Sequence, residues 1–125
     1  IAAHLEQQDR SIAVIAMIED PHALDQLEEI LAVDGLDAVF IGRGDLTVAY
    51  GETKGGSAPV KAASQKIAEA ARAVGKPICV MTGSAADAGD LAQLGATAFI
   101  VSSDQAFLRN AAASALSDVR ETVTK

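Results

Sequence analysis

The chain has 125 residues, half of them hydrophobic, which fits one ordinary domain with a buried core and excludes wholesale disorder. Its formal net charge of −7, from 10 Lys and Arg against 17 Asp and Glu, argues against binding to nucleic acid and to anionic membranes. The lone Cys79 cannot form an internal disulfide, and neither a signal peptide nor a run of about 20 apolar residues is recognisable, so a cytoplasmic protein is expected.

Strands and helices are predicted to alternate along the chain. Short, β-branched apolar runs indicate strands buried on both faces, and apolar positions at helical spacing indicate the helices between them. In chain order, the predicted elements are the end of a helix at 1–8, a strand at 11–18, a helix from 20 to 35, a strand at 37–42, a helix at 59–74, a strand at 77–81, a helix at 84–94, a strand at 98–102 and a helix at about 104–122.

Local signals mark several helix ends. Asp20 followed by Pro21 is a favourable N-cap and first helical position, and Ser84 is expected to cap the helix that it precedes. Gly35 and Gly95 each follow a helical pattern and are expected to end it. In the last helix an apolar stripe is expected to face inward, formed by Phe107, Leu108, Ala112, Ala115, Leu116 and Val119.

The longest predicted loop covers residues 43–57. It is polar and rich in glycine, and a single helical turn is expected within it at 46–50. Long loops in compact domains often hold binding sites or lids, so we expect this loop to border a site.

The order of the elements predicts an α/β fold with parallel strands joined by right-handed crossovers. Four such units match half of a (β/α)8 TIM barrel, which usually needs about 250 residues. A doubly wound sheet is the alternative arrangement. Because residue 1 is Ile rather than Met, we expect the chain to have been processed, cut or taken from the middle of something larger.

Candidate functional residues follow the predicted strands, because ligands of parallel α/β folds bind at the C-terminal ends of the strands. Glu19 follows the most apolar strand, where an unpaired carboxylate is costly, and Asp45 follows the second strand. Each has a simpler interpretation, Glu19 as a first-turn acid favoured by the helix dipole and Asp45 as the N-cap of the turn at 46–50. Together, on neighbouring strands about 4.8 Å apart, they form a hard oxygen pair that suits Mg²⁺ or Mn²⁺. The other strand-end candidates are Met17, Asp20, Arg43, Gly44, Thr82, Ser84, Ser102, Ser103 and Asp104.

The remaining polar and reactive residues give weaker evidence for a functional site. The run from Gly42 to Asp45 offers backbone amides suited to an anion, and Arg43 either clamps that anion or is solvated. His4 and His22 belong to no set with zinc spacing and are expected in solvent, and Cys79 is expected in the core. No lysine lies at an apolar strand end, where a Schiff-base lysine is expected.

Two stretches resemble a known enzyme family. Ile18-Glu19-Asp20-Pro21 and residues 30–46, ILAVDGLDAVFIGRGDL, are similar to the class II pyruvate aldolases, a superfamily that includes 4-hydroxy-2-oxoheptanedioate aldolase, 2-dehydro-3-deoxyglucarate aldolase and the citrate lyase β-chain. The similarity is most specific at the strand-end Glu and the I-G-x-x-D-L run, and it extends more loosely over the whole chain. It implies the second half of the family's barrel, strands five to eight, so residues 1–125 are expected to be a single segment, the C-terminal half-barrel of a larger TIM-barrel domain.

The resemblance also implies a metal-dependent carbon–carbon lyase. By analogy, Glu19 and Asp45 are the protein ligands of a divalent metal, Mg²⁺ or Mn²⁺, and the backbone amides of Gly44 and Asp45 bind the carboxylate of pyruvate or a related 2-oxo acid. The metal stabilises an enolate, which adds to an aldehyde or forms when the carbon–carbon bond cleaves. The family's catalytic base and its substrate-polarising Arg come from the earlier half-barrel, so no catalytic residue is expected in this half. A homo-oligomer is expected by the same analogy.

Two positions depart from the family pattern. Met17 stands where the family commonly has Gln, two residues before the Glu and on the same side of the strand, so it is expected beside the substrate without a polar contact. Arg43-Gly44 stands where Pro-Ala is frequent, and the added charge suits an anionic substrate. Met17, Arg43, Gly44 and Asp45 are therefore the expected substrate-binding residues.

Two other functions stay open from the sequence. An acyl-CoA lyase of the citrate lyase β-chain type also uses a strand-end Glu and Asp for Mg²⁺, although this acidic chain offers few basic residues for CoA. A small doubly wound binding module would place the same carboxylates at a switch point without catalysis. The aldolase function predicts that the isolated 125-residue chain holds metal ligands but cannot turn over substrate.

Overall fold

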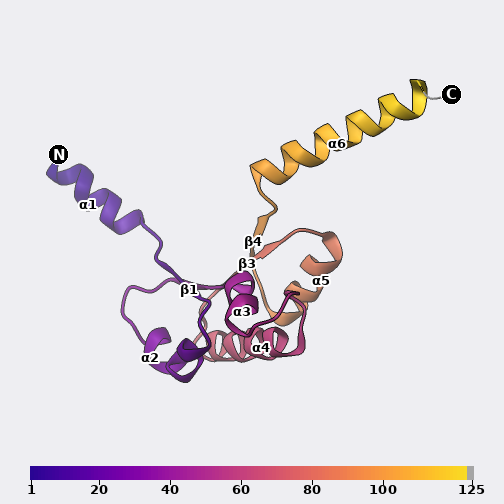
Figure 1. The fold of residues 1–125 in the computed structure, drawn as a ribbon. Coiled ribbons are helices and arrows are strands. Elements are labelled where there is room, and N and C mark those ends of the chain that lie inside the picture. Colours follow the sequence, from indigo (N-terminus) through magenta and orange to yellow (C-terminus); the bar gives the residue numbers. More distant parts are fainter. Residues whose placement is uncertain (124–125) are drawn as a thin grey trace.

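The computed structural model describes residues 1–123 and contains one sheet of four parallel strands (Figure 1). The strands are β1 (Ile15–Ile18), β2 (Ala38–Ile41), β3 (Ile78–Thr82) and β4 (Ala98–Val101). The helical segments are α1 (Ala2–Ser11), η1 (Pro21–Asp25), α2 (Leu27–Leu31), α3 (Arg43–Ala49), α4 (Ala58–Ala73), α5 (Ala85–Leu94) and α6 (Asp104–Val123). The predicted alternation and the α/β class are confirmed.

The order of the strands decides between the two predicted arrangements. Neighbours along the chain are also neighbours in the sheet, in the order β1-β2-β3-β4, and every pair is parallel. A doubly wound sheet needs a point at which the strand order reverses. The order never reverses within residues 1–123, so the doubly wound alternative is wrong, and the sheet has the sequential order of a barrel.

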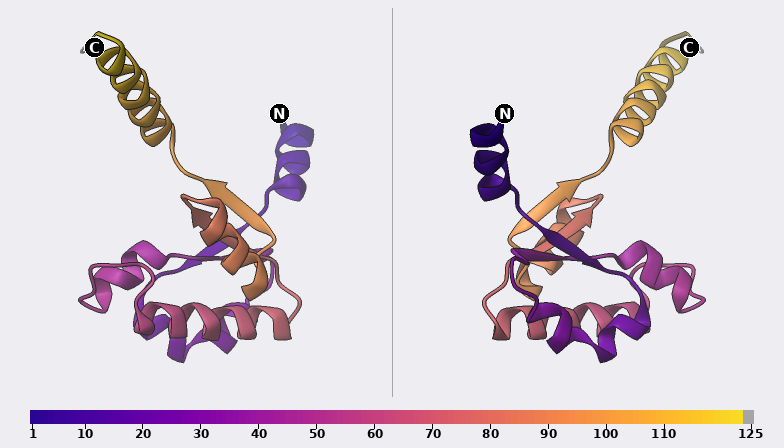
Figure 2. Two further views of the ribbon diagram at one scale, coloured as in Figure 1. Left: turned by 90° about the vertical axis from the view of Figure 1, so that its right-hand side faces the viewer. Right: turned by 90° about the vertical axis from the view of Figure 1, so that its left-hand side faces the viewer.

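One face of the sheet packs against helices and forms the core. Side chains from β1, β2 and β3 meet the apolar side of α4 and α2, and Figure 2 shows α4 running along this face. Burial of each large aliphatic side chain contributes about 1.5–3 kcal/mol. The main participants are Ile18, Leu31, Val39, Ile41, Val60, Ala63, Ile67, Ala71, Ile78 and Val80.

The opposite face of the sheet is left open by residues 1–123. Met17, Phe40, Met81 and Ile100 lie on this face, because their side chains alternate with those of the core strand residues. Met17 is 53% exposed and Ile100 is 54% exposed. Since β1 and β4 each pair with one strand only, the sheet also has two open edges.

Two predicted elements have different bounds in the structure. The helix predicted from 20 to 35 is split into η1 and α2, because Gln26 adopts φ −115° and ψ 14°, outside the helical region. Asp20 nevertheless caps η1 as predicted, and its carboxylate accepts the backbone N–H of His22 at 2.9 Å. The turn predicted at 46–50 is a longer helix, α3, which begins at Arg43.

The two terminal helices extend away from the sheet (Figure 2). Neither α1 nor the described part of α6 has a buried residue. The expectation that the apolar stripe of α6 faces inward is therefore wrong for this chain, since Phe107, Leu108, Leu116 and Val119 are all exposed. Neither α6 nor any other helix within residues 1–123 has the length and apolar character needed to cross a membrane.

Candidate metal and substrate site

Glu19 and Asp45 come together at the C-terminal ends of β1 and β2. Glu19 directly follows β1, and Asp45 lies in the first turn of α3, which follows β2 after Gly42. Because Gly42 occupies the N-cap position, the simpler interpretation of Asp45 as an N-cap is wrong. A hydrogen bond with the Asp45 side chain raises the pKa of Glu19, and desolvation and the negative charge of Asp45 raise it further.

Gly42 makes that approach possible. A Cβ atom at this position would lie 2.5 Å from Cβ of Glu19, closer than real Cβ atoms come, and 3.3 Å from Cγ of Met17, which is a tight contact. The backbone N–H of Gly42 donates to the carbonyl of Ile18 at 3.0 Å, which fixes the end of β2 against the end of β1. Sequence reasoning treated Gly42 only as a source of anion-binding amides. Its position next to the Glu19 side chain becomes evident only when the strands are paired.

The predicted site residues line one hollow at this end of the sheet. Its volume is about 640 Å³, and it is bounded by the open face of the sheet and the start of α3. The hollow therefore brings together every residue that the sequence assigned to metal or substrate. Its lining includes Met17, Glu19, Phe40, Gly42, Arg43, Gly44, Asp45, Gly55, Gly56, Met81, Asp87 and Ile100.

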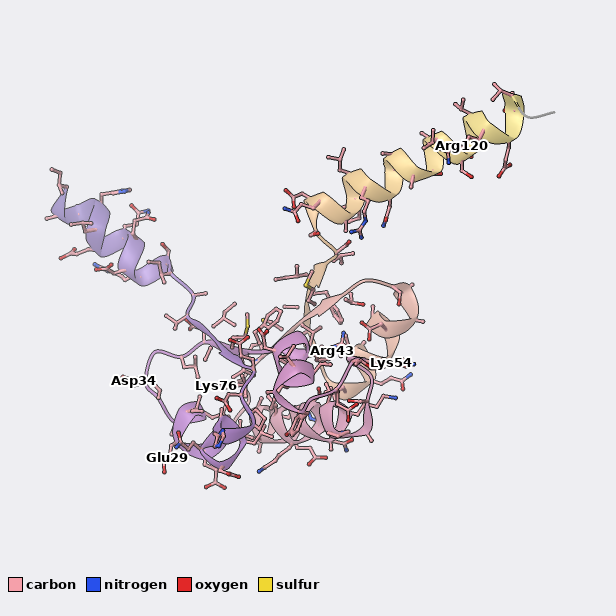
Figure 3. The ribbon with its side chains drawn as sticks, in the orientation of Figure 1. Glu29, Asp34, Arg43, Lys54, Lys76 and Arg120 are labelled. Atoms are coloured by element: carbon pink, nitrogen blue, oxygen red, sulfur yellow. The ribbon has the colours of Figure 1, made fainter. Side chains whose placement is uncertain are left out.

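Arg43 points from the start of α3 toward α5 (Figure 3). Its two terminal nitrogens donate to the two carboxylate oxygens of Asp87 at 2.8 and 2.7 Å, and Nη2 also donates to the carbonyl of Met81 at 2.9 Å. The Arg43 guanidinium lowers the pKa of Asp87, against the effect of desolvation, and a hydrogen bond from Thr82 lowers it further. The side chain of Arg43 is thus engaged within the protein, which sequence reasoning did not foresee.

A second hollow adjoins the first on the far side of Arg43. It has a volume of about 520 Å³ and lies between α4 and α5. Arg43, Gly55, Gly56 and Asp87 line both hollows, so the Arg43–Asp87 ion pair forms part of the wall between them.

Most of the remaining strand-end candidates have structural roles. Ser84 caps α5 as predicted, and its hydroxyl accepts the backbone N–H of Asp87 at 3.2 Å. At the start of α6, the hydroxyl of Ser103 accepts the N–H of Ala106 at 3.2 Å. Ser102 adopts a φ of 60°, rare for a residue with a side chain, at the end of β4.

The histidines and the cysteine stay apart from the carboxylate pair. His4 and His22 are exposed, and Nδ1 of His22 lies 3.0 Å from Oδ1 of Asp20. The backbone N–H of His22 is the main reason that the pKa of Asp20 is lowered. Cys79 is buried in β3, as predicted for a small core residue. Among the described residues, no group of three or more His, Cys, Asp and Glu side chains lies close enough together to hold a metal, so Glu19 and Asp45 form a two-residue set.

Comparison with known proteins agrees with the resemblance seen in the sequence. The pattern of the HpcH/HpaI aldolase/citrate lyase family matches residues 2–111. The chain is 36% identical over 109 residues to the 5-keto-4-deoxy-D-glucarate aldolase of Enterobacter sp. (strain 638), and the match covers 86% of this chain and 43% of that protein. The chain therefore spans less than half the length of the curated relatives it matches.

Solved structures of about twice the length contain the same arrangement. The crystal structure of the citrate synthase SbnG aligns with a TM-score of 0.87 and 25% identity, covering 100% of this chain and 51% of that chain. The HpcH/HpaI aldolase from Desulfitobacterium hafniense DCB-2 aligns with a TM-score of 0.85 and 29% identity, covering 96% of this chain and 47% of the other. The four strands thus correspond to about half of a TIM-barrel-type aldolase. In sequence and in fold, the chain belongs to the HpcH/HpaI aldolase/citrate lyase family.

Proposed function

We propose that the protein containing this chain is a divalent-metal-dependent carbon–carbon lyase that joins or separates a 2-oxo acid, such as pyruvate, and an aldehyde. The observation that carries this proposal is the contact between Glu19 and Asp45 at the C-terminal ends of two adjacent strands. In parallel barrels, this end of the sheet is where substrates bind.

The chemistry of the pair fits a hard cation. Both donors are carboxylates, the ligands preferred by Mg²⁺ and Mn²⁺. The pKa of Glu19 is raised first by its hydrogen bond with the Asp45 side chain, then by desolvation and by repulsion from the Asp45 charge. A cation bound by Glu19 and Asp45 would remove that repulsion. When bound, it supplies Lewis acidity that favours the enolate of the 2-oxo acid.

The residues around the pair bind and orient the substrate in this proposal. Gly44 and Asp45 are in the first turn of α3, where backbone N–H groups have no carbonyl partner within the helix, and these amides receive the substrate carboxylate. Met17 presents an apolar side chain on the open face of the sheet, beside Glu19. A methionine here favours an apolar or small group on the substrate at the position that it faces.

The names of the relatives agree with this class of reaction. One relative is named as an aldolase of a keto-deoxy sugar acid, and one similar structure is named as a citrate synthase. Both names describe reactions of carboxylic acids that make or break a carbon–carbon bond. We place the substrate of this protein in the same broad class, the 2-oxo acids.

Metal titration tests the proposal directly. In the complete natural polypeptide that carries this sequence, Glu19→Gln and Asp45→Asn each remove a ligand charge and are expected to weaken Mn²⁺ binding by at least tenfold. In the same two variants, the rate at which the methyl protons of pyruvate exchange with solvent deuterium is expected to fall, because the metal is bound more weakly. NMR measures this rate.

Matched substitutions on exposed acids serve as controls. Glu29→Gln on α2 and Asp34→Asn after it repeat the same chemical changes far from the hollow (Figure 3) and are expected to leave Mn²⁺ affinity unchanged. Metal-dependent proton exchange that survives both site substitutions would rule out the proposed site.

A further inference from the structure

We infer that Asp87 is a positioning residue that holds the proposed metal ligand Asp45 in place through Arg43. This inference rests on the proposed function, because it concerns the same metal site. Arg43 is the first residue of α3 and Asp45 is the third, so a force on the Arg43 side chain acts on the turn that carries the ligand. Asp87 lies 44 residues further along the chain, in α5.

The Arg43–Asp87 contact has the geometry of a strong ion pair. Two parallel hydrogen bonds of 2.8 and 2.7 Å join the guanidinium to both carboxylate oxygens, and the two side chains are only 22% and 32% exposed. Charge-assisted, bidentate pairs of this kind are the strongest hydrogen bonds between side chains. The Lys66–Asp25 pair is a contrast, with a distance of 3.8 Å and side chains that are 55% and 84% exposed.

Asp87 is itself fixed by the end of β3. The hydroxyl of Thr82 donates to Oδ2 of Asp87 at 2.8 Å, and Thr82 is only 3% exposed. The backbone of Asp87 is held as well, because its N–H donates to the capping residue Ser84. A carboxylate that is anchored at its backbone and at its side chain gives Arg43 a rigid partner.

The turn that carries Asp45 has few other supports. α3 has seven residues, and Gly42 at its N-cap offers no side chain to cap it. A helix this short is marginal in water without tertiary contacts. Its other described supports include the buried side chains of Leu46 and Thr47 and the hydrogen bond from the Gly42 N–H, at its N-cap, to the carbonyl of Ile18. The hydrogen bond from Thr47 to the carbonyl of Arg43 at 2.6 Å lies within the helix. The Arg43 side chain adds the contact that ties the first turn of α3 to β3 and α5.

This geometry separates two roles for Arg43. If Arg43 bound the substrate directly, its removal would raise KM for the substrate and leave metal affinity unchanged. If Arg43 is instead a brace, meaning a side chain that holds the turn of Asp45 in place through Asp87, its removal weakens metal binding. It then also lowers kcat at a limiting metal concentration. Lysine cannot replace the planar fork that reaches both oxygens of Asp87 and the Met81 carbonyl, so Arg43→Lys is expected to behave as a loss of the brace.

The test uses the complete natural polypeptide and Mn²⁺ alone as the probe. Asp87→Ala and Arg43→Met are each expected to raise the Mn²⁺ dissociation constant about tenfold, and the double variant is expected to be no worse than either single one, because both remove the same contact. Thr82→Val is expected to have a smaller effect in the same direction, and Thr82→Ser, which keeps the hydroxyl, is expected to restore most of the affinity. Asp25→Ala removes the exposed ion pair with Lys66 and is the matched control. The Mn²⁺ dissociation constant of this variant is expected to be unchanged.

The outcomes distinguish this inference from the proposed function. If Glu19→Gln abolishes Mn²⁺ binding while Asp87→Ala and Thr82→Val bind Mn²⁺ within twofold of the unchanged protein, the metal site stands and the brace is refuted. A higher substrate KM in Arg43→Met at unchanged Mn²⁺ affinity also refutes the brace and makes Arg43 a substrate ligand. If the unchanged protein does not bind Mn²⁺, the proposed function fails and the inference fails with it. Should Asp87→Ala not fold, Asp87→Asn and Thr82→Val carry the same comparison.

Discussion

Gly42 shows how one small residue sets the geometry of the candidate site. The backbone of β2 passes so close to the Glu19 side chain that no Cβ fits between them. The predicted metal pair therefore depends on a residue that contributes no ligand atom. At the level of single residues, the site is built as much by the absence of a side chain as by the two carboxylates.

Gly42→Ala is expected to destabilise the protein and to disturb Glu19. The added methyl group would lie 2.5 Å from Cβ of Glu19, so the two strand ends must separate, at a cost of about 1–3 kcal/mol. Urea denaturation measures the loss, and Mn²⁺ titration measures the effect on the carboxylate pair. Gly44→Ala is the matched control, because an added Cβ there meets no atom within 4 Å. Equal stability of the two variants would contradict the close approach.

The residues that stand out in the sequence are those with local signals; the caps Asp20 and Ser84 are confirmed, and Glu19 and Asp45 stay predicted ligands. Glu19 and Asp45 stand out because each follows an apolar strand, and Asp20 and Ser84 stand out because they precede helical patterns. The Arg43–Asp87 pair has no local signal, since its two members are 44 residues apart and either side chain is equally plausible in solvent. Only the pairing of β2 with β3 brings α3 and α5 close enough for the contact.

Between elements, the same ion pair couples α3 to α5 in a way that depends on pH. The pKa of Asp87 in the folded protein is below its ordinary value of 3.8, so the unfolded chain binds the proton more readily. The stability that the ion pair contributes is fully present above that ordinary value. It is lost as the pH falls through the lowered pKa of the folded state.

Asp87→Asn is therefore expected to be less stable than the unchanged protein at pH 7, with a difference that shrinks toward about pH 2.5. Chemical denaturation at the two pH values measures this difference. Asp25→Asn, which alters the exposed pair with Lys66, is expected to show little difference at either pH. If the difference in free energy of unfolding between Asp87→Asn and the unchanged protein is the same at both pH values, the coupling is contradicted.

Helix boundaries were harder to predict than strand positions. Each strand lies within a predicted run or extends one residue beyond it, because β-branched apolar runs are distinctive. The predicted helix from 20 to 35 breaks at Gln26, a residue with no intrinsic tendency to end a helix. α3 begins three residues before its predicted start, because Gly42 ends β2 and Arg43 finds a partner across the sheet. At α3, a contact with a distant element accompanies the departure from the local pattern; the break at Gln26 has no structural explanation.

Over the whole molecule, the four-stranded sheet buries one face and leaves the other exposed. The apolar side chains of Met17, Met81 and Ile100 on the open face are each about half exposed, and both sheet edges are unpaired within the described chain. An apolar face with open edges favours association with another polypeptide. The expectation of a homo-oligomer stays a prediction.

The 125-residue polypeptide produced alone is expected to self-associate and to have no aldolase turnover. Light scattering after size-exclusion chromatography measures the first property, and pyruvate release from a keto-deoxy sugar acid measures the second. Ile100→Lys places a charge on the open face and is expected to reduce the association. The control Val48→Lys changes an exposed apolar residue on α3 and is expected to have a smaller effect. A stable monomer, or substantial turnover, would contradict these expectations.

Under the proposed function, the shared wall between the two hollows would link the length of the substrate to metal binding. Arg43 and Asp87 stand between the space beside Glu19 and the space between α4 and α5, so shortening either side chain would join the two into a longer channel. If Arg43 acts as proposed, widening the site in that way for a longer aldehyde would also loosen the turn that carries Asp45. Gly55 and Gly56 border both spaces without that penalty, because an added Cβ at either position meets no atom closer than 3.7 Å. Substrate length is therefore better tuned from the loop than from the ion pair.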